Sequence, residues 1–327
     1  MDRSNPFDPV YKILNTVEPA QKLAAMPDFP RLMDVELTNS CNFHCLMCPV
    51  GVGTQRRPKG FMSEEVFASV LAQAAEHKCP LRFILWGEPT LHPRWVEYLG
   101  RAVQAGLLVH FNTNGSRMEA DDMRRLVDLG VHSVKFSFQG VDRKSYREMR
   151  NTDYFEQLLA KIELLHGIRG DAPNPFIHAS TTITYEGPEL VAAFRKRASA
   201  FTDKITVGRT ELDRFDATSA KLSPDELAVL ERMRAEDQLV QKHPRCAEVF
   251  DKLSVYWDGR VSVCCRDFEG VMQVGDLREQ PLAEIWKTAK AQAYREALAR
   301  GEYDKFPLCR RCWDYYGLQT PGLQGVE

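Results

Sequence analysis

Residues 33–48 read MDVELTNSCNFHCLMC, a strand-like segment that runs directly into three cysteines. Cys41, Cys45 and Cys48 have the spacing CxxxCxxC. Three thiolates on one short loop can bind three corners of an iron–sulfur cube and leave the fourth iron open, whereas a structural zinc ion takes four ligands. The spacing therefore favours an iron–sulfur cluster, with zinc as the alternative because His44 offers a fourth ligand inside the loop.

Around this loop, short β-branched or aromatic runs alternate with longer amphipathic runs from residue 33 to 212, a pattern typical of βαβ units and a parallel sheet. The six expected strands are 33–37, 81–86, 107–112, 133–138, 176–184 and 204–212. The expected helices are 63–77, 94–105, 120–129, 144–166 and 188–201, with Ser63 as an N-cap. Six such units predict an α/β fold, a partial TIM-like (β/α)6 barrel.

The pattern changes after residue 212. A polar segment with one helical stretch after Ser223-Pro224 predicts a helical bridge. Residues 253–266 read LSVYWDGRVSVCCR, in which Asp258-Gly259 predicts a two-residue hairpin turn. A helix over 282–299 and the terminal CRRCW follow. The expected division is an N-terminal extension (1–30), the barrel (31–212), the bridge (213–245), a small C-terminal domain (246–320) and a tail (321–327).

The composition excludes several classes of protein. Forty-three Lys and Arg against forty-five Asp and Glu give a net charge of -2, so no strong field attracts nucleic acid or an anionic membrane. No apolar run approaches the roughly 18 residues of a membrane span, and the N-terminus lacks the apolar core of a secretory signal. The expected location is the cytoplasm, where nine cysteines bind metal or react rather than form disulfides.

A second group of cysteines lies in the C-terminal third: Cys246, Cys264, Cys265, Cys309 and Cys312. Four thiolates can close a cube completely, and a structural zinc ribbon is the rival. Because neighbouring strand residues face opposite ways, only one of Cys264 and Cys265 can readily ligate, and the spacing favours Cys264, on the face of Leu253 and Val255. Cys265 is then a buried small side chain, a hydrogen-atom donor beside a substrate, or an alternative ligand. Cys79, beside Pro80, is expected to be structural.

The CxxxCxxC loop after the first strand resembles that of the radical S-adenosylmethionine superfamily. The resemblance implies a [4Fe-4S] cluster on Cys41, Cys45 and Cys48 whose open iron takes the amino and carboxylate groups of S-adenosylmethionine, and reductive cleavage of that cofactor to a 5′-deoxyadenosyl radical. In the family an aromatic side chain often precedes the last cysteine and packs on adenine. Here Met47 stands in its place, and a polarisable methionine can fill that space.

Three further segments at predicted strand ends resemble motifs of this family. Trp86-Gly87-Glu88-Pro89 is similar to GGEP, whose backbone and carboxylate meet the methionine ammonium. Asn112-Thr113-Asn114-Gly115 resembles the NTNG turn, and Ser137-Phe138-Gln139-Gly140 matches a segment that holds ribose and carboxylate. The alternative for the last two is a pair of ordinary βα turns. The implied cofactor contacts are Met47, Gly87, Glu88, Pro89, Asn114, Ser137 and Gln139.

The C-terminal third resembles the shortened SPASM fold called twitch, including the EIW segment at 284–286. The resemblance implies an auxiliary [4Fe-4S] cluster on Cys246, Cys264, Cys309 and Cys312. A cube closed by four cysteines favours an electron relay, which suits oxidation of an alcohol to a ketone. The same ligand order and the Trp-Gly-Glu-Pro variant resemble the aminocyclitol dehydrogenases of aminoglycoside biosynthesis. The expected function is therefore a radical oxidoreductase, a dehydrogenase acting on a sugar or aminocyclitol.

The catalytic residues are less well defined. In those dehydrogenases an arginine after the sixth strand lies near the substrate hydroxyl, and Arg209 stands at a corresponding place. A guanidinium is a poor base, so orienting the hydroxyl or binding the cofactor carboxylate is the alternative role. Glu211 and Asp213 are alternative proton acceptors.

Three other functions stay open. An epimerase would use Cys265 as its hydrogen donor. A peptide-modifying SPASM enzyme is less favoured because no segment resembling a winged-helix peptide reader precedes the barrel. A zinc-stabilised interaction module has no use for the barrel motifs. The expected partners are a small-molecule substrate and flavodoxin or ferredoxin as reductant.

Overall fold

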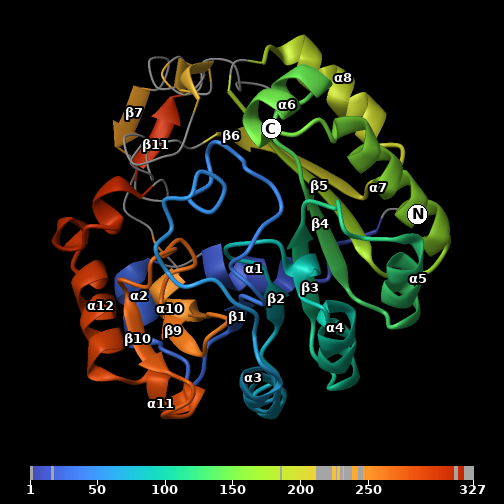
Figure 1. Ribbon diagram of the computed structural model, residues 1–327. Coiled ribbons are helices and arrows are strands. Elements are labelled where there is room, and N and C mark those ends of the chain that lie inside the picture. The colour runs from blue at the N-terminus through green and yellow to red at the C-terminus, as the bar shows by residue number, and fades with distance from the viewer. Residues whose placement is uncertain are drawn as a thin grey trace.

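One curved sheet organises the computed structural model, which describes residues 3–15, 18–184, 186–210, 223–225, 227–228, 231, 238–241, 246, 248–312 and 316–319. Its strands are β1 (Leu32–Val35), β2 (Leu81–Phe83), β3 (Val109–Thr113), β4 (Ser133–Ser137), β5 (Phe176–Ile183), β6 (Lys204–Arg209), β8 (Lys252–Val255), β9 (Arg260–Ser262) and β10 (Gln273–Asp276). They lie in the order β10-β9-β8-β1-β2-β3-β4-β5-β6 (Figure 1). The described residues contain no helix long and apolar enough to cross a membrane.

The six predicted βα strands are confirmed as parallel neighbours in chain order, β1 to β6. Helices α3 (Glu64–Glu76), α4 (Trp95–Gln104), α5 (Ala120–Asp128), α7 (Phe155–Arg169) and α8 (Pro188–Ala198) lie outside this sheet (Figure 1). Ser63 caps α3 as expected, because its Oγ accepts a hydrogen bond from the amide of Val66 at 3.2 Å. The fold class is confirmed.

Two predicted helices are each divided in two. The helix expected over 144–166 consists of α6 (Arg143–Arg150) and α7, because Asn151 adopts a left-handed conformation with φ of 52° and ends α6. The helix expected over 282–299 consists of α11 (Leu282–Trp286) and α12 (Ala289–Ala299). There the Thr288 hydroxyl caps the second helix by accepting from the Ala291 amide at 3.3 Å.

The C-terminal unit continues the barrel sheet instead of standing apart from it. Strand β8 pairs in parallel with β1, with Met33 opposite Leu253 and Asp34 opposite Ser254. β9 and β10 then add antiparallel strands beyond β8. The edge of β1 is therefore covered by the segment that carries the second group of cysteines, and the division expected at residue 246 does not interrupt the sheet.

The hairpin between β8 and β9 differs from the prediction by one residue. Val255 pairs with Val261, and Ser254 with Ser262, so the loop has three residues (257–259) and not two. Strand β9 ends at Ser262, and Cys264 begins a turn closed by its carbonyl and the amide of Asp267 at 3.2 Å. Assigning Cys264 to the face of Leu253 by strand alternation was therefore wrong, because neither Cys264 nor Cys265 is in a strand.

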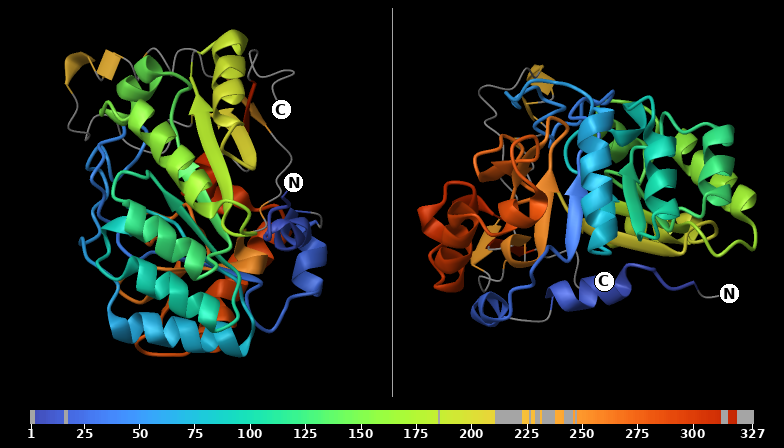
Figure 2. Two further views of the ribbon diagram at one scale, coloured as in Figure 1. Left: turned by 90° about the vertical axis from the view of Figure 1, so that its right-hand side faces the viewer. Right: turned by 90° about the horizontal axis from the view of Figure 1, so that it is seen from below.

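The terminal segments add elements that the sequence did not predict. Helices α1 (Asp8–Asn15) and α2 (Pro19–Ala24) lie outside the sheet (Figure 2). The ring of Phe7 lies 5.7 Å from that of His110 on β3, so the N-terminal segment packs against the base of the barrel. In the bridge, β7 (Gln238–Gln241) pairs antiparallel with β11 (Tyr316–Gln319). Most of the predicted bridge and all of the tail lie outside the described residues.

A buried ion pair joins three segments at the mouth of the barrel. Glu36, fully buried just after β1, accepts hydrogen bonds from Nη1 and Nη2 of Arg57 at 2.9 and 2.6 Å. The Arg57 guanidinium also lies 4.1 Å from the ring centroid of Tyr256 and donates from Nε to the Phe268 carbonyl at 2.7 Å. The start of the cysteine loop, its end and the C-terminal unit therefore share one arginine.

Breaking this pair should destabilise the whole fold. Arg57→Met leaves the Glu36 carboxylate buried without a cationic partner, so we expect the free energy of unfolding to fall by about 3–5 kcal/mol in urea titrations. The double variant Glu36→Gln/Arg57→Met should lose less. Arg124→Met is the control, since Arg124 pairs with Asp121 on an exposed surface. Equal losses in Arg57→Met and Arg124→Met would contradict the role of the pair.

Candidate active site

The three cysteines of the first motif line one cavity of about 220 Å³ at the carboxyl ends of the first strands. Its wall includes residues from all four predicted motifs, together with Arg150: Cys41, Cys45, Met47, Cys48, Gly87, Glu88, Asn114, Ser137 and Arg150. Segments separated by more than 100 residues therefore meet at this cavity. We call it the cysteine cavity.

The cysteine loop fits a cluster better than a single ion. The sulfur atoms of Cys41, Cys45 and Cys48 do not all lie within 4.8 Å of one another, so as they stand they do not surround one tetrahedral zinc. His44, the possible fourth zinc ligand, is exposed. Burial raises the pKa of the Cys41 thiol to about 12 and that of Cys48 to about 11, so these ligands need a positively charged group to become thiolates at neutral pH.

Arg150, at the end of α6, lies beside this loop. Its Nη1 donates to Cys45 Sγ at 3.4 Å, its Nη2 donates to the Ser137 carbonyl, and its Nε has no hydrogen-bond partner among the described residues. A buried guanidinium in a cavity is suited to bind a carboxylate. The sequence did not distinguish this arginine, because only the fold brings the end of α6 to the cysteines.

Gly87 is required by a close approach of two backbones. Its φ is +100°, and a Cβ there would lie 2.3 Å from the carbonyl oxygen of Thr38 and 2.7 Å from that of Ser40. The neighbouring amide of Glu88 donates to the Ser40 carbonyl at 2.8 Å. The Gly-Glu-Pro turn after β2 is therefore pressed against the residues that lead into Cys41.

The Glu88 carboxylate connects the turns after β2 and β3. It is buried, and it accepts from the Thr90 amide at 3.1 Å, the Thr113 hydroxyl at 2.7 Å and the Asn114 amide at 2.7 Å. Burial raises its pKa. This carboxylate therefore positions both turns around the cavity, and its expected contact with the methionine ammonium stays a prediction. Pro89 begins the short helix η1 (Pro89–Leu91) and is buried away from the cavity lining.

The other predicted cofactor contacts divide between two cavities. Asn114 lies beside the cysteine loop, where its Nδ2 donates to Asn42 Oδ1 at 3.1 Å. Ser137 lines the same cavity, whereas Gln139 lines a second one of about 540 Å³ inside the barrel. We call the second one the barrel cavity. The two cavities adjoin, because Met47, Leu85, Trp86 and Asn112 line both of them.

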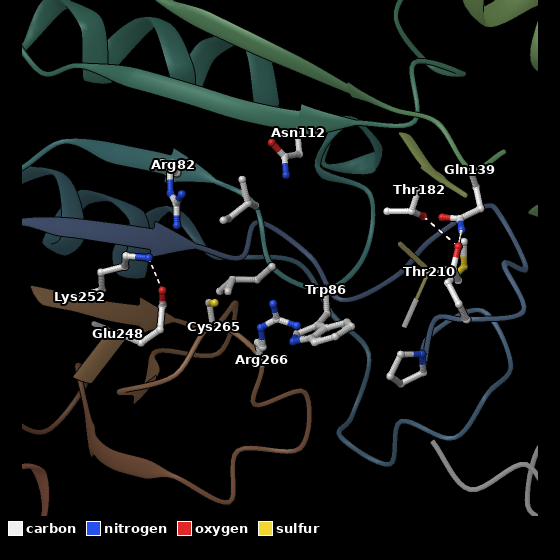
Figure 3. A pocket seen from close by; sticks show the side chains of 14 residues that line it. Arg82, Trp86, Asn112, Gln139, Thr182, Thr210, Glu248, Lys252, Cys265 and Arg266 are labelled. Atoms are coloured by element: carbon white, nitrogen blue, oxygen red, sulfur yellow. Dashed lines mark hydrogen bonds and ion pairs between the residues drawn. The ribbon is translucent and has the colours of Figure 1, made fainter. Parts of the chain in front are cut away.

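The barrel cavity has an uncharged and a charged end (Figure 3). At the uncharged end the Gln139 amide donates to the Thr210 hydroxyl, which donates to Thr182 Oγ1 at 3.2 Å. The charged end holds Arg82, Glu248, Lys252, Cys265 and Arg266. The Trp86 indole lies between them beside Arg266, and its buried Nε1 has no hydrogen-bond partner among the described residues.

Ion pairs organise the charged end. Arg82 donates from Nε and Nη2 to Asp34 at 2.7 and 2.8 Å, and Lys252 forms an ion pair with Glu248. Cys265 Sγ lies within 4.8 Å of carboxylate oxygens of both Asp34 and Glu248. None of these charged residues was predicted. The available signal was a charge in the middle of an apolar strand, as at Asp34 in LMDV and Arg82 in LRF.

The structure separates the two adjacent cysteines. Cys265 lines the barrel cavity, and Cys264 is not part of that lining. Burial raises the pKa of the Cys264 thiol, with smaller contributions from Cys265 and then Cys246. Cys309 and Cys312 form one turn, in which the Cys312 amide donates to the Cys309 carbonyl at 3.1 Å. Cys264 as the auxiliary ligand and Cys265 as the odd thiol therefore stay predictions. Cys79 is buried and donates to the Pro30 carbonyl at 3.1 Å, as a structural residue does.

The predicted catalytic arginine is only partly described. The backbone of Arg209 ends β6, next to Ile183 on β5, which places this position at the mouth of the barrel. Its side chain lies outside the described part of the chain, as do Glu211 and Asp213. Their proposed roles therefore rest on the sequence alone.

Comparison with known families identifies two regions. The model of the radical SAM superfamily matches residues 35–197, and that of SPASM, an iron–sulfur cluster-binding domain, matches residues 246–313. The chain belongs to the radical SAM superfamily. The expected cofactors, S-adenosylmethionine and two [4Fe-4S] clusters, are thereby confirmed in preference to zinc. The expectation that the protein is an enzyme of this superfamily is confirmed as well.

Individual relatives differ widely in their activities. The chain is 30% identical over 170 residues to an AdoMet-dependent heme synthase of Methanosarcina barkeri, and spans 47% of that protein's length. It is 22% identical over 298 residues to the S-adenosyl-L-methionine-dependent 2-deoxy-scyllo-inosamine dehydrogenase of Niallia circulans, covering 86% of this chain and 92% of that one.

Solved structures support the fold. BtrN in complex with AdoMet and 2-DOIA is similar with a TM-score of 0.55 and 17% identity, over 91% of this chain and 96% of that one. Streptococcus suis SuiB bound to S-adenosylmethionine has a TM-score of 0.64 and 16% identity, over 89% and 73%. At these identities the likeness establishes the radical SAM fold and leaves the reaction open.

A single methyl group at Gly87 should disrupt the cysteine cavity. Gly87→Ala adds both a strained φ and a clash with the Thr38 carbonyl, so we expect iron incorporation at the first cluster and binding of S-adenosylmethionine to be lost. Gly106→Ala is the matched control, because Gly106 has φ of +78° and a Cβ added there would meet nothing within 4 Å. Iron content and equilibrium dialysis measure both effects, and full occupancy in Gly87→Ala would contradict this account.

Proposed function

We propose that this protein is a radical SAM dehydrogenase that oxidises a carbinol of a sugar or aminocyclitol to a ketone. The observation that carries the proposal is the barrel cavity, which adjoins the cysteine cavity through four shared residues and offers hydroxyl and amide groups at one end. A polyhydroxylated substrate needs such donors and acceptors, because its own hydroxyls lose water on binding.

The residues around the two cavities have separate roles in this proposal. Cys41, Cys45 and Cys48 would hold the first cluster, and Arg150 and Asn114 would bind the polar groups of the cofactor. When bound, the cofactors supply a 5′-deoxyadenosyl radical that removes the carbinol hydrogen and an auxiliary cluster that accepts the second electron. Gln139, Thr182 and Thr210 would orient substrate hydroxyls. On the sequence alone, Arg209 would orient the reacting hydroxyl, and Glu211 or Asp213 would accept its proton.

The similarity to the Niallia circulans dehydrogenase supports this choice, because it extends over most of both chains. The place of Cys265 in the wall of the barrel cavity supports it as well, because under this proposal its neighbour Cys264 is an auxiliary ligand and the auxiliary cluster would lie near the substrate. A flavodoxin or ferredoxin would supply the first electron. The proposed units are the barrel over 31–212 and the auxiliary domain over 246–320.

Anaerobic reconstitution tests the cofactor assignment. We expect about eight iron and eight sulfide per chain, falling to about four of each when Cys41, Cys45 and Cys48 are replaced by Ala, with loss of 5′-deoxyadenosine formation from S-adenosylmethionine and dithionite. Zinc in place of iron, or no cofactor cleavage by the wild type, would overturn the proposal.

A second candidate function is epimerisation, favoured by the place of Cys265 in the wall of the barrel cavity. There its S–H could return a hydrogen atom to the opposite face of a substrate radical. An epimerase returns a product of unchanged mass, whereas a dehydrogenase product is two mass units lighter.

Replacing Cys265 distinguishes the two reactions. With 2-deoxy-scyllo-inosamine and related sugars as substrates, Cys265→Ala should leave formation of a ketone largely unchanged, because the thiol takes no part in oxidation. Under the epimerase hypothesis the wild type incorporates one deuterium from D2O and Cys265→Ala stops turnover. Mass spectrometry of the product reads both results, and deuterium incorporation that depends on Cys265 would contradict the dehydrogenase.

A further inference from the structure

The base of the barrel cavity carries more positive than negative charge. Successive side chains of a strand point to opposite faces of the sheet. The core residues of β1, β2 and β8 face outward, so the residues between them, Asp34, Arg82 and Lys252, face the barrel interior. Lys135 faces the same side of β4, where it stands opposite Asn112, a residue that lines the cavity. Lys204, exposed at the start of β6, shares this face, because Lys135 pairs with His178 and His178 with Lys204. The described strands therefore place four cations and one carboxylate on the inner wall, to which α10 (Glu248–Asp251) adds Glu248.

The carboxylates at this end are already paired. Asp34 accepts two hydrogen bonds from Arg82, and Glu248 forms the ion pair with Lys252. These pairs also argue against a metal ion among Asp34, Glu248 and Cys265, although their ligand atoms are close enough together, because both carboxylates hold a cation already. Neither carboxylate is left for an amine of a substrate.

Lys135 takes no part in these ion pairs. Its side chain is partly buried, and its ammonium group forms no hydrogen bond or ion pair within the described part of the chain. Burial, together with the charge of Arg82, lowers the pKa of Lys135 to about 8, so it stays largely protonated at neutral pH. His110 and His178 line the same interior as neutral groups, because burial lowers both of their pKa values.

Besides the Lys135 ammonium, Arg82 also has a donor group without a hydrogen-bond partner. Its two bonds to Asp34 use Nε and Nη2, and Nη1 has no hydrogen-bond partner among the described residues. Two cationic side chains of the inner wall thus keep donors without a protein acceptor. Asp34 balances the charge of Arg82, whereas the partly buried charge of Lys135 has no ion-pair partner in the described part of the chain, and a bound anion would supply one.

We propose that the substrate carries an anionic group, a carboxylate or a phosphate, that binds at the base of the barrel cavity between Arg82, Lys135 and Lys252. The inference rests on the proposed function, in that this cavity is the substrate site. It narrows the substrate to an acidic sugar, such as a sugar acid or sugar phosphate, in preference to an aminocyclitol amine.

Binding of glucose and three of its derivatives tests whether the site prefers an anionic sugar. The reconstituted protein with S-adenosylmethionine would be titrated calorimetrically with glucuronate, glucose 6-phosphate, glucose and glucosamine at constant ionic strength. We expect one or both anions to bind about tenfold or more tightly than glucose, and glucosamine to bind most weakly. Tighter glucuronate indicates a carboxylate substrate, and tighter glucose 6-phosphate a phosphate. Equal binding of charged and neutral sugars, or a preference for glucosamine, would overturn the proposal.

A substitution locates the anion. Lys135→Gln should weaken binding of the preferred anion about tenfold while leaving glucose unaffected, because it removes one charge and keeps a polar side chain of similar length. Lys287→Gln is the matched control, since Lys287 pairs with Asp28 on the surface. Circular dichroism and iron content would verify that both variants are folded and loaded. Loss of affinity in both variants, or in neither, would contradict the assignment.

Turnover separates this inference from the proposed function. Anion binding that depends on Lys135, without oxidation of any bound sugar, would retain the anionic site and reject the dehydrogenase. Oxidation of neutral or amino sugars that is unaffected by Lys135→Gln would retain the dehydrogenase and reject the anionic site.

Discussion

The pairing of Glu36 with Arg57 is the constraint on which the arrangement of the two cavities depends. Glu36 marks the point at which β1 enters the cysteine loop, and Arg57 lies where the chain leaves it. The same guanidinium contacts Tyr256 and Phe268 of the C-terminal unit. A buried pair contributes little net stability compared with apolar packing, but it has one correct partner. It therefore sets the position of the cysteine loop relative to both the barrel and the auxiliary domain.

The wall of the barrel cavity depends on the continuous sheet that the barrel forms with the C-terminal unit. Strand β8 supplies Lys252 to the wall next to Asp34 and Arg82, and the turn after β9 supplies Cys265. One cavity is thus built from the barrel and from the unit that carries the auxiliary cysteines. This cavity has an uncharged and a charged end, and the shared residues Met47 and Trp86 connect it to the cysteine loop.

The sequence predicted the parts of this site that local patterns encode. The cysteine spacing, the turns after β2, β3 and β4, and the order of the parallel strands depend on neighbouring residues, and they were recognised. Lys135 and Arg150 were not, because their roles arise from side chains on other strands and helices. The predicted hairpin loop was one residue too short, because Asp-Gly favours positive φ in loops of two or three residues alike. The division of α6 from α7 depends on Asn151, which many helices would tolerate in their interior.

The covered edge of β1 has a consequence for how the chain is made. Leu32 pairs with Lys252, so 220 residues must be synthesised before this edge of the strand meets its neighbour. Until then β1 presents unpaired amides and carbonyls on that side, the kind of edge to which other chains add. Contacts over such long separations form slowly. The nascent chain therefore carries an open strand edge during the interval in which the helices between β1 and β6 can already have formed.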